Sequence, residues 1–522
     1  MVAVSNGFPV VVVGAGQAGL AVSYELTARG VEHVVLERAR VGQMWRGLWD
    51  SFCLVTPNWT MSLPGAAYAG DDPEGFVPRD EIVRYLQRYA SSFGAPVREG
   101  VGVDSLEPGP NGGFLLRTSA GELRAESVVV CTGAYQRPHR PEMAAGFPRD
   151  VLAIDAQYYR NPAALPSGKI LVVGSGQTGC QLAEELREAG REVFLACGWA
   201  PWLPRRPGGR DIVTWLRETT FFDTPLSALP SPAARLGANL LVTGHRGGHD
   251  LHYRTLQAMG VQLLGRLAGV EGHRASFAAD LADSVAFGDA RYADIRKLLG
   301  EQLPARGIAA PELPDPPPFH ADPPLELDLN GFGVVVFTSG FRPDYARWVR
   351  FPAFDAMGFP LTDNGASTVV PGLYFCGVHF MRKRKSSVLF GVGEDAAIVA
   401  QSIARHRHST TQPHCAPERA GSVRDASATD PPHLPGGPGD ACRPLRRRLP
   451  GRIGLVAARP GQEPRPPLAS RPRRSGCGPL PERSRLPWTY CATLNHEDAG
   501  HFVVVERPDA LVEALRAALG NR

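Results

Sequence analysis

The fold is decided by the stretch VVVVGAGQAG at residues 10–19. A run of four valines is typical of a strand buried on both faces of a parallel sheet. The glycines Gly14, Gly16 and Gly19 have the GxGxxG spacing, and the apolar pattern LAVSYEL (20–26) follows directly. This order predicts a strand, a tight turn and a helix whose first N–H groups can hold the pyrophosphate of a dinucleotide.

A second strand at residues 34–36 ends in Glu37, about twenty residues after the glycines. A carboxylate at this position is suited to a pair of ribose hydroxyls. A GxGxxG motif alone is weak evidence, because glycine-rich turns without a ligand are common. Strand, glycines, helix, second strand and acid in register together predict a first dinucleotide site.

The stretch KILVVGSGQTG at residues 169–179 repeats the strand and the glycine motif. A helix over 178–189 and a strand over 192–196 complete a second unit, which ends in Ala196-Cys197-Gly198 without an acid. Three arginines follow, Arg205, Arg206 and Arg210. Guanidinium groups without a competing acid favour a 2′-phosphate, and therefore NADP, unless they only face solvent. Two dinucleotide sites imply electron transfer, with FAD at the first and NADPH at the second.

Bulk properties exclude several classes of protein. The chain has 522 residues, 43% of them hydrophobic and 21% charged, with a formal charge of +4, which indicates a soluble globular protein of two or three domains. This charge favours neither nucleic acid nor a membrane surface, and no apolar run has the roughly 20 residues of a membrane span. The nine cysteines have no CxxC spacing, which favours reduced thiols and a cytoplasmic location. We expect no metal site, because His245 and His249 in a glycine-rich loop are more typical of a turn.

The other segments predict an α/β protein with two Rossmann-like domains. Buried strands with small-residue ends are expected at 128–134, 333–343 and 372–378, helices at 79–93 and 391–406, short antiparallel strands at 97–106, 113–118 and 122–124, and a proline-rich linker at 303–324. The stretch 214–307 indicates helices and loops. The basic run MRKRK (381–385) is more typical of a solvated loop than of a nucleic-acid patch.

These segments together resemble the flavin-containing monooxygenases and, more closely, the bacterial CzcO-like FAD/NAD(P) flavoproteins. The resemblance covers about residues 8–406. It is carried by GAGQAG (14–19), WRGLWD (45–50), TPNWTMSLPG (56–65), GDDPEGF (70–76), CTGAYQRPHRP (131–141), YRNPAALPSGKILVVGSGQTG (159–179), PRR (204–206), SGFRPDY (339–345) and PGLYFCGVHF (371–380). It implies a discontinuous FAD domain (1–166 and 325–408) with an NADPH domain inserted at 167–324.

The resemblance also implies site residues. The FAD site is expected at Gly14, Gly16, Gln17, Gly19, Glu37, Trp45, Thr132, Gly133 and Gly377. The NADPH site is expected at Gly174, Gly176, Gln177, Thr178, Gly179, Arg205 and Arg206. Asn58 and Arg46 are the catalytic candidates: Asn58 would hydrogen-bond an oxygen adduct at the flavin C4a carbon and Arg46 would hold the loop, and a purely structural role is the alternative for both.

The implied activity is an FAD-dependent, NADPH-using monooxygenase that forms a flavin C4a-(hydro)peroxide and transfers one oxygen atom to a small organic substrate. Its partners would be that substrate and O₂, with no nucleic acid, and a homodimer is a possible assembly. The alternatives are an NAD(P)H:flavin reductase or oxidase that makes peroxide, and a non-catalytic flavin-binding protein.

Two regions depart from the family pattern. Arg149 stands where a glycine is expected, Asp155 or Ala153 where a histidine is expected, and the second ATG-like turn reads Thr338-Ser339-Gly340. These changes bear on the coupling of reduction to oxygenation. The segment 409–485 is rich in proline and arginine, which predicts disorder. The end of the chain (486–522) resembles an α/β-hydrolase remnant, in which His501 has no GxSxG serine, as in a fused or frame-shifted gene.

Overall fold

The computed structural model describes residues 7–110, 112–411, 491–494 and 501–504. The chain forms two compact units, residues 1–419 and 420–522. In the second unit, β20 (Cys491–Leu494) and β21 (His501–Val504) pair antiparallel. Most of the stretch expected to be disordered, and most of the hydrolase-like end, lie outside the described residues.

Strand β1 (Gly7–Val13) lies in the middle of the first sheet, between β2 (His33–Glu37) and β6 (Gly121–Val130). Both neighbours run parallel to β1, with Val11 opposite Val34 on the β2 side. The valines of β1 are almost fully buried, as the apolar run predicted. The sheet order is β17-β18-β19-β6-β1-β2-β3, and β4 and β5 extend from β6. The further strands are β3 (Val97–Glu99), β4 (Val103–Pro108), β5 (Phe114–Thr118), β17 (Thr362–Asp363), β18 (Ala366–Ser367) and β19 (Leu373–Phe375).

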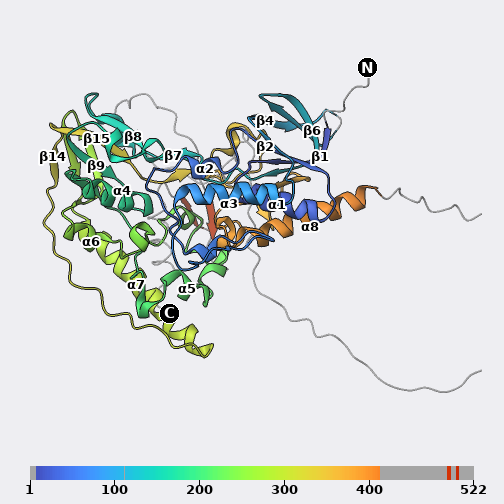
Figure 1. Cartoon of the computed structure of the whole chain (residues 1–522). Helices are drawn as coiled ribbons and strands as arrows, with labels where there is room; N and C mark the ends of the chain where they lie inside the picture. The colour runs from blue at the N-terminus through green and yellow to red at the C-terminus, as the bar shows by residue number, and fades with distance from the viewer. Residues whose placement is uncertain (1–6, 111, 412–490, 495–500, 505–522) are drawn as a thin grey trace, which may run out of the picture. The chain divides into compact units, whose positions relative to one another are not determined.

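Three helices belong to this first sheet. Figure 1 shows α1 (Gln17–Ala28), α3 (Arg79–Ser92) and α8 (Val392–Thr411) side by side. Helix α1 begins directly after the glycine motif and buries its small and apolar residues. The short helix α2 (Gln43–Arg46) follows β2.

The expected strand at 97–106 is two strands. β3 pairs parallel with β2, whereas β4 pairs antiparallel with β5. Gly100 between them has φ +74°, and its N–H donates to the carbonyl of Ala39 at 3.0 Å. The left-handed turn at this glycine ends one strand and redirects the chain before the next.

The second sheet has the order β11-β10-β9-β15-β8. Its strands are β8 (Leu152–Asp155), β9 (Lys169–Val173), β10 (Val193–Ala196), β11 (Gln262–Leu264) and β15 (Phe332–Phe337), all parallel. Helix α4 (Gln177–Glu188) follows β9, which confirms the expected second unit. The inserted part is expected to span residues 167–324. Strand β8 comes before this stretch and β15 after it, and both strands pair within the second sheet, so that sheet extends beyond both expected boundaries. An apolar run such as the one in β15 is equally suited to either sheet.

The chain passes between the two sheets twice. β7 (Arg137–Pro138) lies on the way out and β16 (Phe341–Arg342) on the way back, and they pair antiparallel. The two passes are therefore tied to each other by backbone hydrogen bonds.

The remaining elements lie mostly within the inserted part. They are β12 (Leu267–Glu271), β13 (Arg274–Phe277), β14 (Glu326–Asp328), α5 (Ile212–Arg217), α6 (Tyr253–Ala258) and α7 (Leu281–Ala305). Short 3₁₀ turns lie at Asn58–Thr60 (η1), Glu142–Gly146, Ala156–Tyr158, Pro162–Ala164, Pro207–Gly209, Phe221–Asp223 (η6), Leu226–Ala228, Pro232–Leu236, His245–Gly247, Tyr345–Arg347 and Arg384–Ser387 (η11). The proline-rich linker has no helix or strand between α7 and β14.

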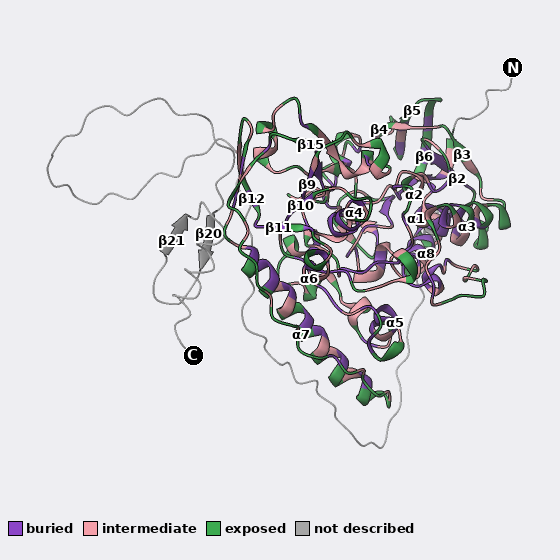
Figure 2. Cartoon of the chain, turned by 60° about the vertical axis from the view of Figure 1, so that its left-hand side comes forward, coloured by how far each residue is buried: buried purple, intermediate pink, exposed green. Residues whose placement is uncertain are grey.

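Figure 2 shows the buried residues on the strands of the second sheet and on the inward stripe of α7, and residues 18–23 of α1 are all buried. Helix α7 has its outer stripe exposed. Among the residues that the structure describes, no helix combines the length and the apolar character needed to cross a bilayer.

Candidate dinucleotide sites

The first glycine motif forms a tight loop between β1 and α1. Gly14 has φ +106°, and a Cβ atom there would lie 2.9 Å from the carbonyl oxygen of Cys131. A Cβ atom on Gly19 would lie 1.8 Å from the carbonyl oxygen of Gly14. A Cβ atom on Gly16 would meet nothing within 4 Å. Packing thus requires the outer two glycines, while the middle one leaves open space at the first turn of α1, as a bound pyrophosphate needs.

Glu37 lies where a ribose-binding acid is expected. Its side chain is buried at the end of β2, and its two oxygens accept from the N–H groups of Ala15 (2.9 Å) and Ala39 (3.0 Å). These bonds hold the carboxylate beside the glycine loop. Each oxygen keeps a second lone pair, so the carboxylate can still accept from ribose hydroxyls.

The ends of β6 and β19 meet the same loop. Gly377 has φ +80°, and a Cβ atom there would lie 2.4 Å from the Cβ of Ala18 in α1. Gly133 has φ +67° with no atom within 4 Å of an added Cβ, and its carbonyl accepts from the Tyr345 hydroxyl at 2.7 Å. Thr132 accepts from Gln136. The tertiary structure therefore brings together strand ends that lie far apart in the sequence.

Gln17 and Trp45 link the first motif to two other segments. The indole Nε1 of Trp45 donates to Oε1 of Gln17 at 3.1 Å, and Nε2 of Gln17 donates to the carbonyl of Ser387 at 3.2 Å. Gln17 thus lies at the start of α1, and Trp45 contacts it from α2.

The two catalytic candidates make contacts within their own loops. Asn58 is buried; its Nδ2 donates to the carbonyl of Asp72 at 2.8 Å and its Oδ1 accepts from the N–H of Val77 at 2.7 Å. Arg46 donates from Nε to the carbonyl of Val41 at 3.2 Å. These contacts support a positioning role for both residues, and a direct catalytic role stays a prediction.

The second glycine motif repeats the geometry of the first. Gly174 has φ +106°, and a Cβ atom there would lie 2.9 Å from the N atom of Ser339. A Cβ atom on Gly179 would lie 1.9 Å from the carbonyl oxygen of Gly174. The Thr338-Ser339 turn therefore packs against this loop, and Thr338 Oγ1 donates to the carbonyl of Val173 at 3.0 Å. The serine that departs from the family pattern is compatible with the fold.

The other predicted residues of the second motif lie in the same place. A Cβ atom on Gly176 would lie 3.6 Å from the Cβ of Ala238. The side chain of Gln177 makes two hydrogen bonds to the backbone of Val242. Its Nε2 donates to the carbonyl, and its Oε1 accepts from the N–H, with the N atom at 3.0 Å. Thr178 lies in the first turn of α4. The segment 238–242 thus borders the loop.

The fold and both loops have counterparts in known proteins. The family described as "Pyridine nucleotide-disulphide oxidoreductase" matches residues 11–220. An uncharacterized CzcO-like oxidoreductase from Geobacillus kaustophilus is 29% identical over 400 residues, which are 76% of this chain and 98% of that protein. The flavin-containing monooxygenase from Stenotrophomonas maltophilia superposes with a TM-score of 0.54 at 18% identity, covering 77% of this chain and 99% of the other. The chain is similar over most of its length to the CzcO-like oxidoreductases, and it has the fold of the flavin-containing monooxygenases.

A relative in sequence with a named activity covers less of the chain. Rice indole-3-pyruvate monooxygenase YUCCA1 is 31% identical over 204 residues, which are 38% of this chain and 50% of that protein. Together with the two glycine loops, these matches support FAD and NADPH as the cofactors of this oxidoreductase.

Arg205, a predicted NADPH contact, lines the same cleft as Arg206 but is almost fully buried. Its guanidinium is buried, with Nε 2.9 Å from Oδ2 of Asp211 and Nη1 donating to the carbonyl of Val55 at 2.9 Å. It also lies over the ring of Phe76, at 4.3 Å from the centroid. Burial lowers the pKa of Arg205 to about 10. Arg205 thus joins the inserted part of the fold to the loop at residues 54–77.

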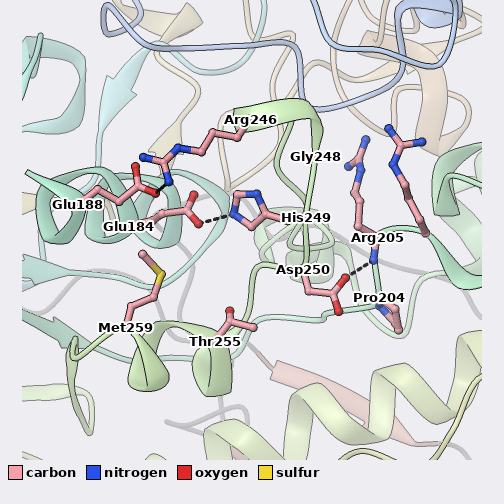
Figure 3. A pocket seen from close by; sticks show the side chains of 11 residues that line it. Glu184, Glu188, Pro204, Arg205, Arg246, Gly248, His249, Asp250, Thr255 and Met259 are labelled. Atoms are coloured by element: carbon pink, nitrogen blue, oxygen red, sulfur yellow. Dashed lines mark hydrogen bonds and ion pairs between the residues drawn. The ribbon is translucent and has the colours of Figure 1, made fainter.

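Arg206 remains exposed and borders a cleft of about 730 Å³. In this cleft (Figure 3), Arg246 pairs with Glu188 at 2.9 Å and His249 with Glu184 at 2.5 Å. The Glu184 carboxylate, which accepts a hydrogen bond from the imidazole, raises the pKa of His249. The predicted histidine turn is therefore docked on α4 through carboxylates. The i,i+4 spacing of Glu184 and Glu188 is the sequence signal that predicts one helix face carrying both acids.

Proposed function

We propose that this chain is an FAD-dependent monooxygenase that uses NADPH and O₂ to transfer one oxygen atom to a small organic substrate. The observation that carries the proposal is the presence of two glycine loops of the same geometry, each at the carboxyl end of a strand with parallel neighbours, in one compact unit. A chain with two such loops is suited to passing electrons between two dinucleotides.

The residues present fit both cofactors. Gly14, Gly16, Gly19, Glu37, Thr132, Gly133 and Gly377 would hold FAD, and Gly174, Gly176, Thr178, Gly179 and Arg206 would hold NADPH. When bound, NADPH supplies reducing equivalents and FAD supplies the reaction with O₂. The five cysteines within residues 7–411 are free thiols, which supports a cytoplasmic location as part of the proposal.

The protein's own contribution is to orient the groups and to exclude water. Asn58 holds the segment 72–77 in place. The ring of Trp59 lies 5.5 Å from that of Phe390, and its Nε1 donates to Thr214 Oγ1 of the inserted part at 3.0 Å. The ring of Phe390 also lies 5.0 Å from that of Phe222 in the inserted part, and such contacts between the two parts would keep water out of the space between the cofactors.

A peroxide-forming reductase or oxidase is the second candidate. It is favoured by the contacts of Asn58, because both polar atoms of its side chain already bond to its own loop. Such an enzyme needs no group that protects a bound oxygen species from water.

Isotope-labelled oxygen separates the two candidates. Protein loaded with FAD is reduced by NADPH without air and then mixed with ¹⁸O₂ in the presence of thioethers, amines, ketones or carboxylic acids. The monooxygenase predicts a transient flavin spectrum that is neither reduced nor oxidised, together with ¹⁸O in a product. Stoichiometric release of peroxide with every compound, and no labelled product, would establish the second candidate instead.

A further inference from the structure

The basic segment Arg382–Lys385, expected to be a solvated loop, is packed against acids. Three of its four cations have carboxylate partners. The pairs are Arg382 with Asp395 (2.6 Å), Lys383 with Asp223 (2.7 Å) and Lys385 with both Asp223 (3.1 Å) and Glu394. The charges of Arg382, Lys383 and Lys385 are thus balanced by three carboxylates. The fourth cation of the segment is Arg384.

Among the residues that the structure describes, Arg384 has no such partner. Its guanidinium carbon lies 4.3 Å from the ring centroid of Phe221 and 4.9 Å from that of Phe380. Within residues 7–411, no carboxylate pairs with this guanidinium, and its Nε is buried without a hydrogen-bond acceptor. Arginine stays charged even when it is partly buried, so the site holds a cation that faces two aromatic rings and has no counter-charge among the described residues.

The rings around Arg384 belong to a larger group, which we call the aromatic cluster and define as Trp59, Phe221, Phe222, Phe380 and Phe390. Ring centroids lie 5.1 Å apart for Phe221 and Phe222, 5.0 Å for Phe222 and Phe390, and 5.5 Å for Trp59 and Phe390. The cluster comes from three segments distant in the sequence. It offers apolar and aromatic surface next to the cation.

The segment of Arg384 is anchored on both sides. The N–H of Arg384 donates to the carbonyl of Thr224 at 2.9 Å, which fixes η11 against η6. The carbonyl of Ser387, at the end of η11, accepts from Gln17 at the start of α1. An anion bound by Arg384 would therefore lie in the neighbourhood of the first glycine loop.

We propose that Arg384 binds the carboxylate of the substrate while the aromatic cluster holds its apolar body, so that the substrates are small carboxylic acids with an aromatic or branched aliphatic group. A guanidinium can donate two parallel hydrogen bonds to a carboxylate, which supplies the acceptor that Nε lacks. This inference rests on the proposed function, whose substrate class it names.

Equilibrium binding tests the proposal without turnover. The FAD-loaded full chain is titrated calorimetrically with butanoate, phenylacetate and 3-phenylpropanoate, and with the neutral amide of each acid. The wild type is expected to bind at least one aryl acid about tenfold or more tightly than its amide. Arg384→Met is expected to weaken acid binding by about 10-fold to 100-fold and to leave amide binding unchanged, as for the loss of one charged hydrogen bond.

Two variants serve as controls. Arg217 is exposed and lies over the ring of Trp59 at 4.5 Å, so Arg217→Met removes the same charge from the outer side of the aromatic cluster. We expect it to change acid binding by less than about twofold, because an exposed charge is screened by solvent. Arg384→Lys keeps the charge but not the paired donors, and we expect an intermediate loss of affinity.

Each contrary result has a distinct meaning. Equal affinity for acids and amides, no binding of any acid at millimolar concentration, or unchanged acid binding in Arg384→Met overturns the proposal. If the Met variant does not retain FAD, Arg384→Lys decides, and wild-type acid affinity in that variant overturns it. Acid-selective binding without ¹⁸O transfer refutes the monooxygenase but keeps the anion site. Transfer of ¹⁸O to thioethers without a preference for acids supports the monooxygenase and overturns the anion site.

Discussion

Arg205 and Asp211 form an ion pair inside the protein, with Nε of the arginine 2.9 Å from Oδ2 of the aspartate. Both side chains are almost fully buried, and burial raises the pKa of Asp211. The arginine also reaches the carbonyl of Val55, in a part of the chain 150 residues away. This pair fastens the inserted part to the loop at residues 54–77.

Removing one charge of this pair is expected to be strongly destabilising. Asp211→Asn leaves the guanidinium of Arg205 buried without a counter-charge, which costs about 3–5 kcal/mol of the free energy of unfolding. Urea unfolding measures the loss. The half-exposed pair of Arg210 and Glu218, 3.5 Å apart, gives the matched control: Glu218→Gln is expected to cost less than about 1 kcal/mol. Equal losses in the two variants would contradict the structural role of Arg205.

Two glycines of the first motif are expected to respond differently to alanine. Gly19→Ala places a Cβ atom 1.8 Å from the carbonyl oxygen of Gly14, so we expect destabilisation of about 1–3 kcal/mol. Gly16→Ala meets nothing within 4 Å, so the free energy of unfolding of the FAD-free protein stays within about 0.5 kcal/mol. The added methyl group instead stands where the pyrophosphate approaches, and FAD affinity falls. Flavin retention after gel filtration, measured beside the unfolding curve, separates the two effects. Normal flavin retention in Gly16→Ala would argue against this loop as the FAD site.

Asn58→Ala tests whether Asn58 positions its loop or acts on the reacting groups. The substitution leaves the carbonyl of Asp72 and the N–H of Val77 without their partners, which costs about 1–3 kcal/mol. We expect faster amide exchange over residues 72–77 together with reduced turnover. A variant with wild-type stability and exchange rates that still loses turnover would instead assign Asn58 a direct catalytic role.

The loop around residue 249 is expected to dock more firmly at low pH. The Glu184 carboxylate, which accepts a hydrogen bond from His249, raises the pKa of His249 above its ordinary value of 6.5. A raised pKa means that this stabilisation is complete below about pH 6.5 and is lost as the pH rises through the pKa of the folded state. Amide exchange over residues 244–250 should therefore accelerate with pH beyond the intrinsic rate, and His249→Gln should abolish that excess. His273→Gln, which removes the exposed contact with Asp150 at 3.0 Å, is the control and should leave it unchanged.

Most of the architecture could be predicted from contiguous segments. Some features can be recognised from a contiguous stretch of about thirty residues or fewer. These are the valine run of β1, the two glycine motifs and Glu37, and the structure has them as predicted. The placement of β8 and β15 could not be predicted, because parallel strands buried on both faces have the same apolar pattern in either sheet. Only the hydrogen-bonding partners assign them to the second sheet.

The sequence by itself determined where the backbone turns tightly, because a positive φ angle or a close contact at Gly14 and Gly174 admits no side chain. Only the tertiary structure decided what each charged residue does. Arg205 has Asp211 as its partner and is buried, whereas Arg384 is enclosed by Phe221 and Phe380 without a carboxylate in the described part of the chain. Backbone conformation is a local property. The free energy of a charge depends on its burial and on neighbours from distant segments, so a run of basic residues alone cannot predict which one is left to bind a ligand.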